Sequence, residues 1–285
     1  MDRFPETWDL GRRTIDLSRR PCIMGILNVT PDSFSDGSRF YSLEKAVDHA
    51  LEMEAAGADI IDVGGESTRP NADHVDELEE LRRVVPVIES LAGRLKIPIS
   101  IDTYKASVAR AALAAGAEIV NDISGLTFDE RMAETVAAAS AGLVVMHTSG
   151  TPSEMQSNTA YEDMIAAIAA FLRKSLELAA SAGIAASRIV VDPGIGFGKS
   201  VAGNLEIVRR LREFAALGRP VLVGPSRKSF IGKVIGREPD DLVYGTAAAV
   251  AVALVNGASI FRVHDVKEMR DVADMALALS RPGAW

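Results

Sequence analysis

The fold of this chain is decided by the stretch Ile60-Ile61-Asp62-Val63-Gly64-Gly65-Glu66-Ser67-Thr68-Arg69-Pro70, in which an apolar run ends abruptly in glycines and polar side chains. The same order recurs along the sequence. Eight short apolar runs are each followed by polar groups, at residues 22–27, 60–63, 97–101, 119–120, 143–146, 189–191, 221–223 and 260–261. Apolar runs without alternation are typical of parallel strands, because both faces of such a sheet are covered.

Segments with helical periodicity separate these runs. Residues Leu43, Ala46, Val47, Ala50 and Leu51 form one apolar stripe at helical spacing. Several helices are expected to end at a glycine that can adopt the left-handed conformation, namely Gly57, Gly116, Gly183 and Gly257. Strand starts recur at roughly 20 to 46 residues, the length of a βαβ unit, and such units build parallel sheets.

This repeat predicts a (β/α)8 TIM barrel in a single domain that spans residues 1–285. A doubly wound open sheet is the alternative, although it would bind its ligand at one switch point rather than use every strand end. Residues 7–17 alternate around Gly11 and predict a short N-terminal β-hairpin that plugs the mouth of the barrel at the N-terminal ends of its strands. Asp76 followed by Glu79 predicts a capped helix start.

Composition excludes several classes of partner. The chain has 285 residues, 48% of them apolar, and a formal net charge of −8, which argues against a nucleic-acid surface. Cys22 is the only cysteine, so no internal disulfide can form and a reducing compartment is compatible. No apolar stretch approaches the roughly 20 residues needed to cross a bilayer. We therefore expect a soluble cytoplasmic protein without a membrane or nucleic-acid partner.

Positive side chains follow several of the apolar runs. Arg69, Lys228, Arg262 and His264 are all predicted at strand ends on one rim, inside an otherwise acidic protein. Guanidinium groups match phosphate oxygens in a bidentate way, so this set indicates a phosphorylated or pyrophosphorylated ligand. Solvated rim charges are the alternative for any single member of the set.

Asp102, Asn121 and Asp192 form a second group, at the ends of three other runs. Carboxylates deep in a barrel mouth need partners, which a nitrogen-rich heterocycle, a metal or a lysine could supply. Structural pairing of Asp192 with Lys228 stays open. A metal site built only from protein ligands is poorly supported, because the four histidines show no ligand spacing.

The rim also carries long loops and a helix start. Residues 29–41 and 64–75 have the length and composition of catalytic-face loops. Phe197, in the glycine-rich segment 194–199, could stack on an aromatic ring or simply pack. Residues 226–230 open a helix whose free N–H groups suit an anion, although Ser229 could serve only as its N-cap.

Long motifs give the chain a specific resemblance. They are Met24-Gly25-Ile26-Leu27-Asn28-Val29-Thr30-Pro31-Asp32-Ser33-Phe34-Ser35-Asp36-Gly37, Asp62-Val63-Gly64-Gly65-Glu66-Ser67-Thr68-Arg69-Pro70, Ile101-Asp102-Thr103, Asn121-Asp122-Ile123, Asp192-Pro193-Gly194-Ile195-Gly196-Phe197-Gly198-Lys199, Ser226-Arg227-Lys228-Ser229-Phe230 and Arg262-Val263-His264. On these residues the chain resembles the dihydropteroate synthases, pterin-binding barrel enzymes of folate biosynthesis, over residues 7 to 280.

The resemblance implies a transferase that joins 6-hydroxymethyl-7,8-dihydropterin pyrophosphate to 4-aminobenzoate and releases pyrophosphate. It implies a Mg2+ bound by Asn28 and by the pyrophosphate, and a homodimer. The implied pterin contacts are Asp102, Asn121, Ile123, Met146, Asp192, Gly224 and Lys228. The implied pyrophosphate contacts are Asn28, Thr68, Arg69, Arg262 and His264, and those of 4-aminobenzoate are Phe34, Thr68, Pro70, Phe197, Lys228 and Ser229.

The family's reaction is dissociative, so the resemblance implies a cationic pterin methylene after pyrophosphate has left. The catalytic residues would then be Asp102, Asp36, Arg69 and Lys228. The chain departs from the family pattern at Asn71, Pro225 and Thr148-Ser149, which bear on loops and on affinity for 4-aminobenzoate and its sulfonamide mimics. A pterin-dependent methyltransferase and a non-catalytic pterin-binding paralogue stay open as alternatives.

Overall fold

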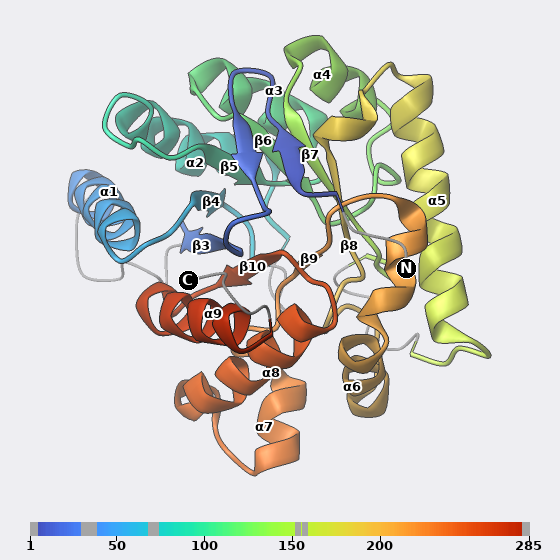
Figure 1. Cartoon of the computed structure of the whole chain (residues 1–285). Helices are drawn as coiled ribbons and strands as arrows, with labels where there is room; N and C mark the ends of the chain where they lie inside the picture. Colours follow the sequence, from blue (N-terminus) through green and yellow to red (C-terminus); the bar gives the residue numbers. More distant parts are fainter. Residues whose placement is uncertain (1–4, 30–38, 68–73, 152–154, 156–158, 281–285) are drawn as a thin grey trace.

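Eight parallel strands form a ring in the computed structural model, which describes residues 5–29, 39–67, 74–151, 155 and 159–280 (Figure 1). They are β3 (Cys22–Asn28), β4 (Ile60–Gly64), β5 (Ile99–Asp102), β6 (Ile119–Asp122), β7 (Gly142–Met146), β8 (Ile189–Asp192), β9 (Leu222–Val223) and β10 (Ile260–Val263). Neighbours along the chain pair with each other, and β10 pairs with β3. A parallel bridge between Val191 and Val221 joins β8 to the start of β9 and closes the ring. The predicted barrel is confirmed, and the open-sheet alternative is wrong.

Helices cover the outside of this ring (Figure 1). They are α1 (Arg39–Ala55), α2 (Glu77–Leu91), α3 (Ala106–Ala115), α4 (Met132–Ala139), α5 (Met164–Ser181), α6 (Val201–Arg209), α7 (Ser229–Ile235), α8 (Val243–Val255) and α9 (Val266–Ser280), with short 3-10 turns η3 (Ala186–Arg188), η4 (Leu211–Leu217) and η5 (Pro239–Asp241). The largest buried apolar cluster lies between helices and strands. Within the described ranges, no helix combines the length and apolar character that a membrane span requires.

The predicted helix signals are present in the structure. Asp76 precedes α2, and its Oδ1 accepts the backbone N–H of Glu79 at 2.9 Å. Gly116 follows α3 with φ of 122°, and a Cβ there would lie 2.5 Å from Cβ of Ala92. Only glycine satisfies both the backbone angle and the close approach, so α3 ends here and β6 begins three residues later.

A two-stranded hairpin lies at one end of the barrel, as the alternation around Gly11 predicts. Its strands, β1 (Thr7–Asp9) and β2 (Thr14–Asp16), pair antiparallel. Trp8 is fully buried against the barrel interior, in one cluster with Leu10, Met24 and Val190, and its Nε1 donates to the carbonyl of Arg188 at 2.8 Å. Since the hairpin covers the N-terminal ends of the strands, the opposite end is left as the entrance to the ring among the residues that the structure describes.

Candidate functional site

The open end of the barrel contains a cavity of about 440 Å³ at the carboxyl ends of the strands. A larger hollow of about 790 Å³ lies at the hairpin end, beside Arg12, Arg110 and Glu134, but no strand-end groups converge there. The sequence-predicted residues that line the strand-end cavity are Asn28, Asp102, Asn121, Ile123, Met146, Asp192, Phe197, Gly224, Lys228, Ser229, Arg262 and His264. Phe34, Asp36, Thr68, Arg69 and Pro70 lie outside the described residues.

A buried ion-pair group lies at the floor of this cavity. Arg262 Nε donates to Asp62 Oδ2 at 2.6 Å, and Arg262 Nη2 donates to Asp102 Oδ2 at 2.6 Å. Asn121 Nδ2 also donates to Asp62 Oδ2, at 3.0 Å. Arg262 lies within β10 rather than beyond it, which differs from the expected rim position. Its guanidinium therefore links β10 to β4 and β5 across the ring.

Asp62 is the buried charge at the floor of the cavity that the sequence analysis did not assign to the site. It is fully buried, and within the described structure its Oδ1 has no hydrogen-bond partner. The available signal was its place inside the apolar run 60–63, where a charge is costly unless it is paired. An inward-facing charge in a strand of this kind indicates a partner on another strand.

The electrostatics of Asp102 follow from this group. Burial raises the pKa of Asp102, and the negative charge of Asp62 raises it further, while Arg262 acts in the opposite direction. One guanidinium thus serves two buried carboxylates. A ligand that brings N–H donors or positive charge to Asp102 would offset the remaining cost of its ionisation.

Asp192 forms a second acidic position on the far side of the ring. Its Oδ1 accepts the backbone N–H of Gly194 at 2.7 Å. Burial raises the pKa of Asp192 to about 6, against the opposing effects of Gly194, Lys199 and Lys228. Lys228 Nζ lies 4.1 Å from the ring centre of Phe197, and a Cβ on Gly196 would come within 2.9 Å of Cδ of Lys228. The glycine thus lets the lysine stem pass close to the backbone.

Apolar side chains form the walls between these polar groups. Ile123, Met146, Met155 and Phe197 make one buried cluster, and Tyr104 packs against it. A cavity with apolar walls and acidic groups at its edges suits a flat heterocycle that has donors along one edge.

The segment after β9 has a special backbone. Arg227 has φ of 55° and turns its guanidinium to Asp265, at 2.6 and 3.1 Å, rather than adding free charge to the rim. Ser226 Oγ lies 3.0 Å from Nδ1 of His264 and accepts the backbone N–H of His264 at 3.2 Å. These two contacts hold the imidazole of His264 in place beside Ser226. Lys228 occupies the N-cap of α7, and Ser229 is its first residue, so the simple N-cap interpretation of Ser229 is wrong.

Lys199 and His147 form a buried pair behind the glycine-rich segment. Lys199 Nζ lies 2.8 Å from Nδ1 of His147 and donates to the carbonyl of His147 at 3.1 Å. Burial lowers the pKa of Lys199 to about 7, and burial together with that lysine lowers the pKa of His147 to about 3. The sequence offered no spacing signal for this pair.

Metal binding depends on few protein groups here. Among the described residues there is no cluster of three or more His, Cys, Asp or Glu that could hold a metal ion. Asn28 ends β3 at the cavity and presents a hard amide oxygen. A divalent cation at Asn28 would therefore take most of its ligands from a bound substrate and from water.

Comparison with known proteins agrees with this geometry. Residues 24–264 match the family described as pterin binding enzyme. The dihydropteroate synthase of Synechocystis sp. is 47% identical over 281 residues, which cover 98% of this chain and 97% of the relative.

Two solved structures extend the likeness to three dimensions. A dihydropteroate synthase from Clostridium difficile, crystallised in the presence of pteroic acid, has a TM-score of 0.89 and 49% identity, and the match covers 94% of this chain and 99% of that one. The Xanthomonas albilineans dihydropteroate synthase with 4-aminobenzoic acid has a TM-score of 0.90 and 43% identity, over 96% and 98% of the two chains.

Proposed function

Since this chain belongs to the dihydropteroate synthase family of pterin binding enzymes, we propose that its strand-end cavity joins 6-hydroxymethyl-7,8-dihydropterin pyrophosphate to 4-aminobenzoate. The products are 7,8-dihydropteroate and pyrophosphate. The observation that carries this proposal is the convergence of Asp102, Asn121 and Asp192 on one cavity with apolar walls.

The pterin ring lies between the apolar walls in this proposal. The amide and amidine edges of the ring face Asp102, Asn121 and Asp192. The two carboxylates accept from adjacent N–H groups, with which they pair well, and the Asn121 amide can both accept and donate. Ile123 and Met146 pack on the ring faces, and Gly224 and Lys228 complete the pocket. The raised pKa of Asp192 supports the assignment, since a carboxyl kept out of water gains most from a ligand that donates to it.

The pyrophosphate lies toward β3 and β10. Asn28, Arg262 and His264 line this side of the cavity, and Thr68 and Arg69 are proposed to join them. The contacts with Ser226 hold the imidazole of His264 at this side of the cavity, where it is proposed to contact the pyrophosphate. Mg2+ fits the donor set, because the amide oxygen of Asn28 is a hard ligand and the pyrophosphate brings more oxygens. When bound, the ion would neutralise negative charge on the pyrophosphate.

The reaction that we propose is dissociative. The bond between the pterin methylene carbon and the pyrophosphate oxygen breaks, and pyrophosphate leaves with the electron pair. Asp102 and Asp36 stabilise the cationic methylene, and Arg69 and Arg262 stabilise the leaving pyrophosphate. Lys228, which holds the pterin, is the remaining catalytic residue of the proposal. The amine of 4-aminobenzoate then attacks the methylene carbon and loses a proton to water. An aniline nitrogen is nucleophilic at neutral pH, so no strong base is required.

4-Aminobenzoate occupies the outer part of the cavity in this proposal. Phe197 and Lys228 already lie against each other at 4.1 Å and offer an apolar face with a positive end. Ser229 begins α7 nearby, and Phe34, Thr68 and Pro70 are proposed as the remaining contacts. Ser229→Ala should raise the KM for 4-aminobenzoate more than the KM for the pterin substrate. Equal effects on both would contradict the assignment.

The deciding experiment is pyrophosphate release by the purified protein. It is supplied with the dihydropterin pyrophosphate and Mg2+, with and without 4-aminobenzoate. Release that depends on 4-aminobenzoate and yields dihydropteroate supports the synthase. Tight pterin binding without release would favour a non-catalytic paralogue, and methyl transfer from a folate would favour a methyltransferase. Omission of Mg2+ should weaken binding of the pyrophosphate substrate but leave binding of the bare pterin unchanged.

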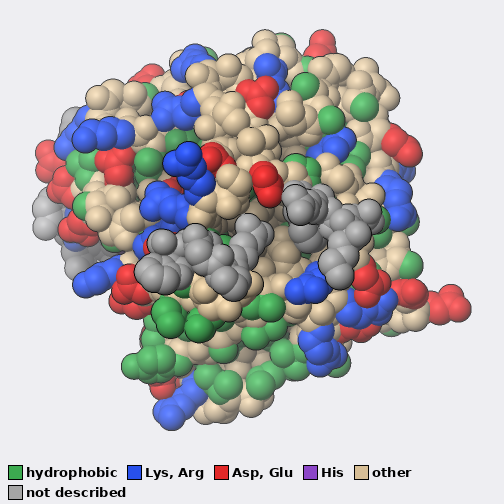
Figure 2. Space-filling view, in the orientation of Figure 1, with side chains coloured by type: hydrophobic (Ala, Val, Ile, Leu, Met, Phe, Trp, Pro, Cys, Tyr) green, Lys and Arg blue, Asp and Glu red, His purple; other side chains and the backbone are tan. Residues whose placement is uncertain are grey.

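We also propose that two copies associate through the α7–α9 side of the barrel and that the protein works in the cytoplasm. Apolar side chains gather over this side (Figure 2). The exposed members are Val234, Ile235, Tyr244, Val252, Val255, Met275 and Leu279, with Tyr244 83% exposed. An apolar patch of this kind is typical of a protein interface. Val252→Asp should convert a dimer to monomers in sedimentation experiments. The single cysteine, which excludes an internal disulfide, supports the cytoplasmic location.

A further inference from the structure

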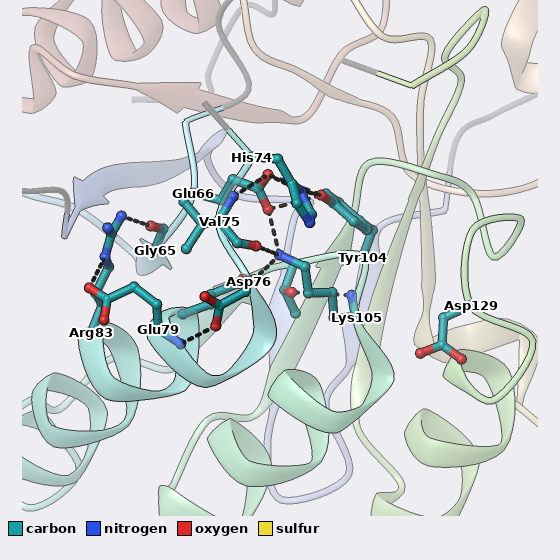
Figure 3. A network of polar contacts seen from close by, with 12 residues as sticks. Gly65, Glu66, His74, Val75, Asp76, Glu79, Arg83, Tyr104, Lys105 and Asp129 are labelled. Atoms are coloured by element: carbon teal, nitrogen blue, oxygen red, sulfur yellow. Dashed lines mark hydrogen bonds and ion pairs between the residues drawn. The ribbon is translucent and has the colours of Figure 1, made fainter. Parts of the chain in front are cut away.

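A group of buried charges lies behind the cavity, between the segment that follows β4 and the start of α3 (Figure 3). Lys105 is its centre. The Nζ of Lys105 donates to Glu66 Oε2 at 2.6 Å, to Glu80 Oε2 at 2.5 Å and to the carbonyl of Val75 at 2.7 Å. We call Glu66, Glu80, Tyr104 and Lys105 the Lys105 cluster. One ammonium thus joins α2 to both ends of the connection that leads into α2.

Glu66 fastens the two ends of this connection to each other. Its carboxylate accepts the Tyr104 hydroxyl at 3.0 and 2.9 Å and the backbone N–H of Val75 at 3.3 Å. The Nδ1 of His74 lies 3.2 Å from the same carboxylate (Figure 3). Residues 66 and 75, nine positions apart, are therefore held side by side.

The cluster is well buried. The side-chain exposure is 1% for Glu80, 9% for Glu66 and 12% for Lys105. Burial raises the pKa of Glu80, whereas Lys105 and Tyr104 outweigh burial at Glu66 and lower its pKa. Two carboxylates share one ammonium, which is an expensive way to stabilise a fold, because apolar side chains of similar size do as well or better. The buried charges of Glu66, Glu80 and Lys105 are explained more directly if they orient the segment that contains Glu66.

The cluster reaches the cavity through Glu66 and Ser67, both of which line it. On its other side, Lys105 follows the floor residue Asp102 by three positions. The pterin-facing groups are held independently, since Arg262 binds Asp102 and the Gly194 backbone binds Asp192. Displacement of Glu66 and Ser67, which we call the rim, would therefore change the part of the cavity that these two residues line and leave the floor groups in place.

We propose that Lys105 is a positioning residue, which through Glu66 orients the rim of the cavity that receives 4-aminobenzoate. This inference rests on the proposed reaction. Lys105 touches neither substrate in it. Its ammonium sets where Glu66 and Ser67 lie, and this placement decides how well the second substrate is aligned with the pterin methylene carbon.

Lys105→Met tests the proposal, with Arg131→Met as the matched control. Arg131 has an exposed side chain and forms an ion pair with Asp129, whose carboxylate accepts the backbone N–H of Ala106 at the start of α3. Because Lys105→Met alone leaves Glu80 buried without its cation, the double variant Lys105→Met/Glu80→Gln is measured beside it. Each protein is assayed by calorimetry for the Kd of the bare pterin, without pyrophosphate, and by kinetics for kcat/KM with respect to 4-aminobenzoate.

Both Lys105 variants should keep a pterin Kd within about twofold of the parent while kcat/KM for 4-aminobenzoate falls about 10- to 100-fold, as misalignment of reacting groups predicts. Arg131→Met should match the parent in both measurements. An unchanged kcat/KM in the folded double variant would overturn the proposal. So would equal losses in pterin binding and kcat/KM, since these indicate a purely structural role. If the parent protein were inactive, the proposed reaction itself would be contradicted. The role of Lys105 is judged separately, from the ratio of kcat/KM in the variant to kcat/KM in the parent.

Discussion

Arg262 Nη2 lies 2.6 Å from Asp102 Oδ2, although the two residues are 160 positions apart in the chain. The same guanidinium binds Asp62, which is 200 positions away and fully buried. The side chains that are predicted to bind and activate the pterin are thus part of one electrostatic group, whose members come from β10 on one side of the pairing between β10 and β3 and from β4 and β5 on the other.

Arg262→Met should destabilise the fold by about 3–5 kcal/mol, because it leaves two buried carboxylates without their cation. The measurement is urea unfolding at pH 7. Arg227→Met is the control, since Arg227 forms an ion pair whose arginine side chain is 42% exposed, and its loss should cost less than about 1 kcal/mol. Addition of Asp62→Asn to Arg262→Met should recover part of the lost stability. No recovery would show that the guanidinium stabilises the barrel by packing alone.

Asp192→Asn should increase stability while it weakens pterin binding. Burial raises the pKa of Asp192 in the fold to about 6. Between about pH 6 and pH 4, Asp192 is therefore protonated in the folded protein but still ionised in the unfolded chain. Ionised Asp192 therefore costs about 2–3 kcal/mol of stability at pH 7.5, and this cost disappears as the pH falls below the ordinary carboxyl range. Asparagine can still accept the Gly194 N–H.

Unfolding of this variant and the parent should be compared at pH 7.5 and pH 5.0. The extra stability of the variant should shrink at the lower pH. The pterin Kd should rise about tenfold or more at pH 7.5, as loss of a charged hydrogen-bond acceptor predicts. If the variant were no more stable than the parent at pH 7.5, or its extra stability over the parent were the same at both pH values, Asp192 would not be ionised at a cost in the free protein.

Lys199→Met should remove a rise of stability with pH. The pKa of Lys199 is lowered by burial to about 7, so from about pH 7 to 10 the unfolded chain holds a proton that the fold has released. Stability due to this group increases over that range by about 1.4 kcal/mol per pH unit. The difference between parent and variant, measured by denaturant unfolding at pH 7, 8 and 9, should change with this slope. The control Lys233→Met alters an exposed lysine and should show no such slope.

Trp8→Ala should cost about 3–5 kcal/mol, because it opens a cavity where the hairpin fills the barrel. Trp8→Phe should lose mainly the hydrogen bond to the Arg188 carbonyl, about 1 kcal/mol. Thr7→Ala, on the exposed neighbouring position, is the control. The hairpin and the cavity lie at opposite ends of the barrel. The kcat at 20 °C, calculated per folded molecule, should therefore stay within about twofold of the parent value. A large drop in kcat would mean that the plug also shapes the active end.

Most of the fold could be predicted because its signals are local. An apolar run, a helical stripe and a terminal glycine are set by neighbouring residues, and their repetition along the chain indicates parallel strands with helices outside. Boundaries moved by only a few residues, as at β5, which begins at Ile99 instead of residue 97. The meeting of Asp102, Asn121 and Asp192 in one cavity was also predictable, since carboxyl ends of parallel strands lie on the same side of a barrel.

The sequence by itself thus determined which residues end the strands and which chemical types they bring to one face of the barrel. Only the tertiary structure decided how these residues pair, that Asp62 belongs to the group, and that Lys199 lies on His147. Pairing between residues so far apart in the chain depends on ring closure and on the direction that each side chain takes from its strand. It also depends on distances between side-chain atoms, where a few ångströms decide whether two groups pair. None of these quantities is encoded by periodicity, because periodicity describes neighbours along the chain rather than neighbours across a barrel.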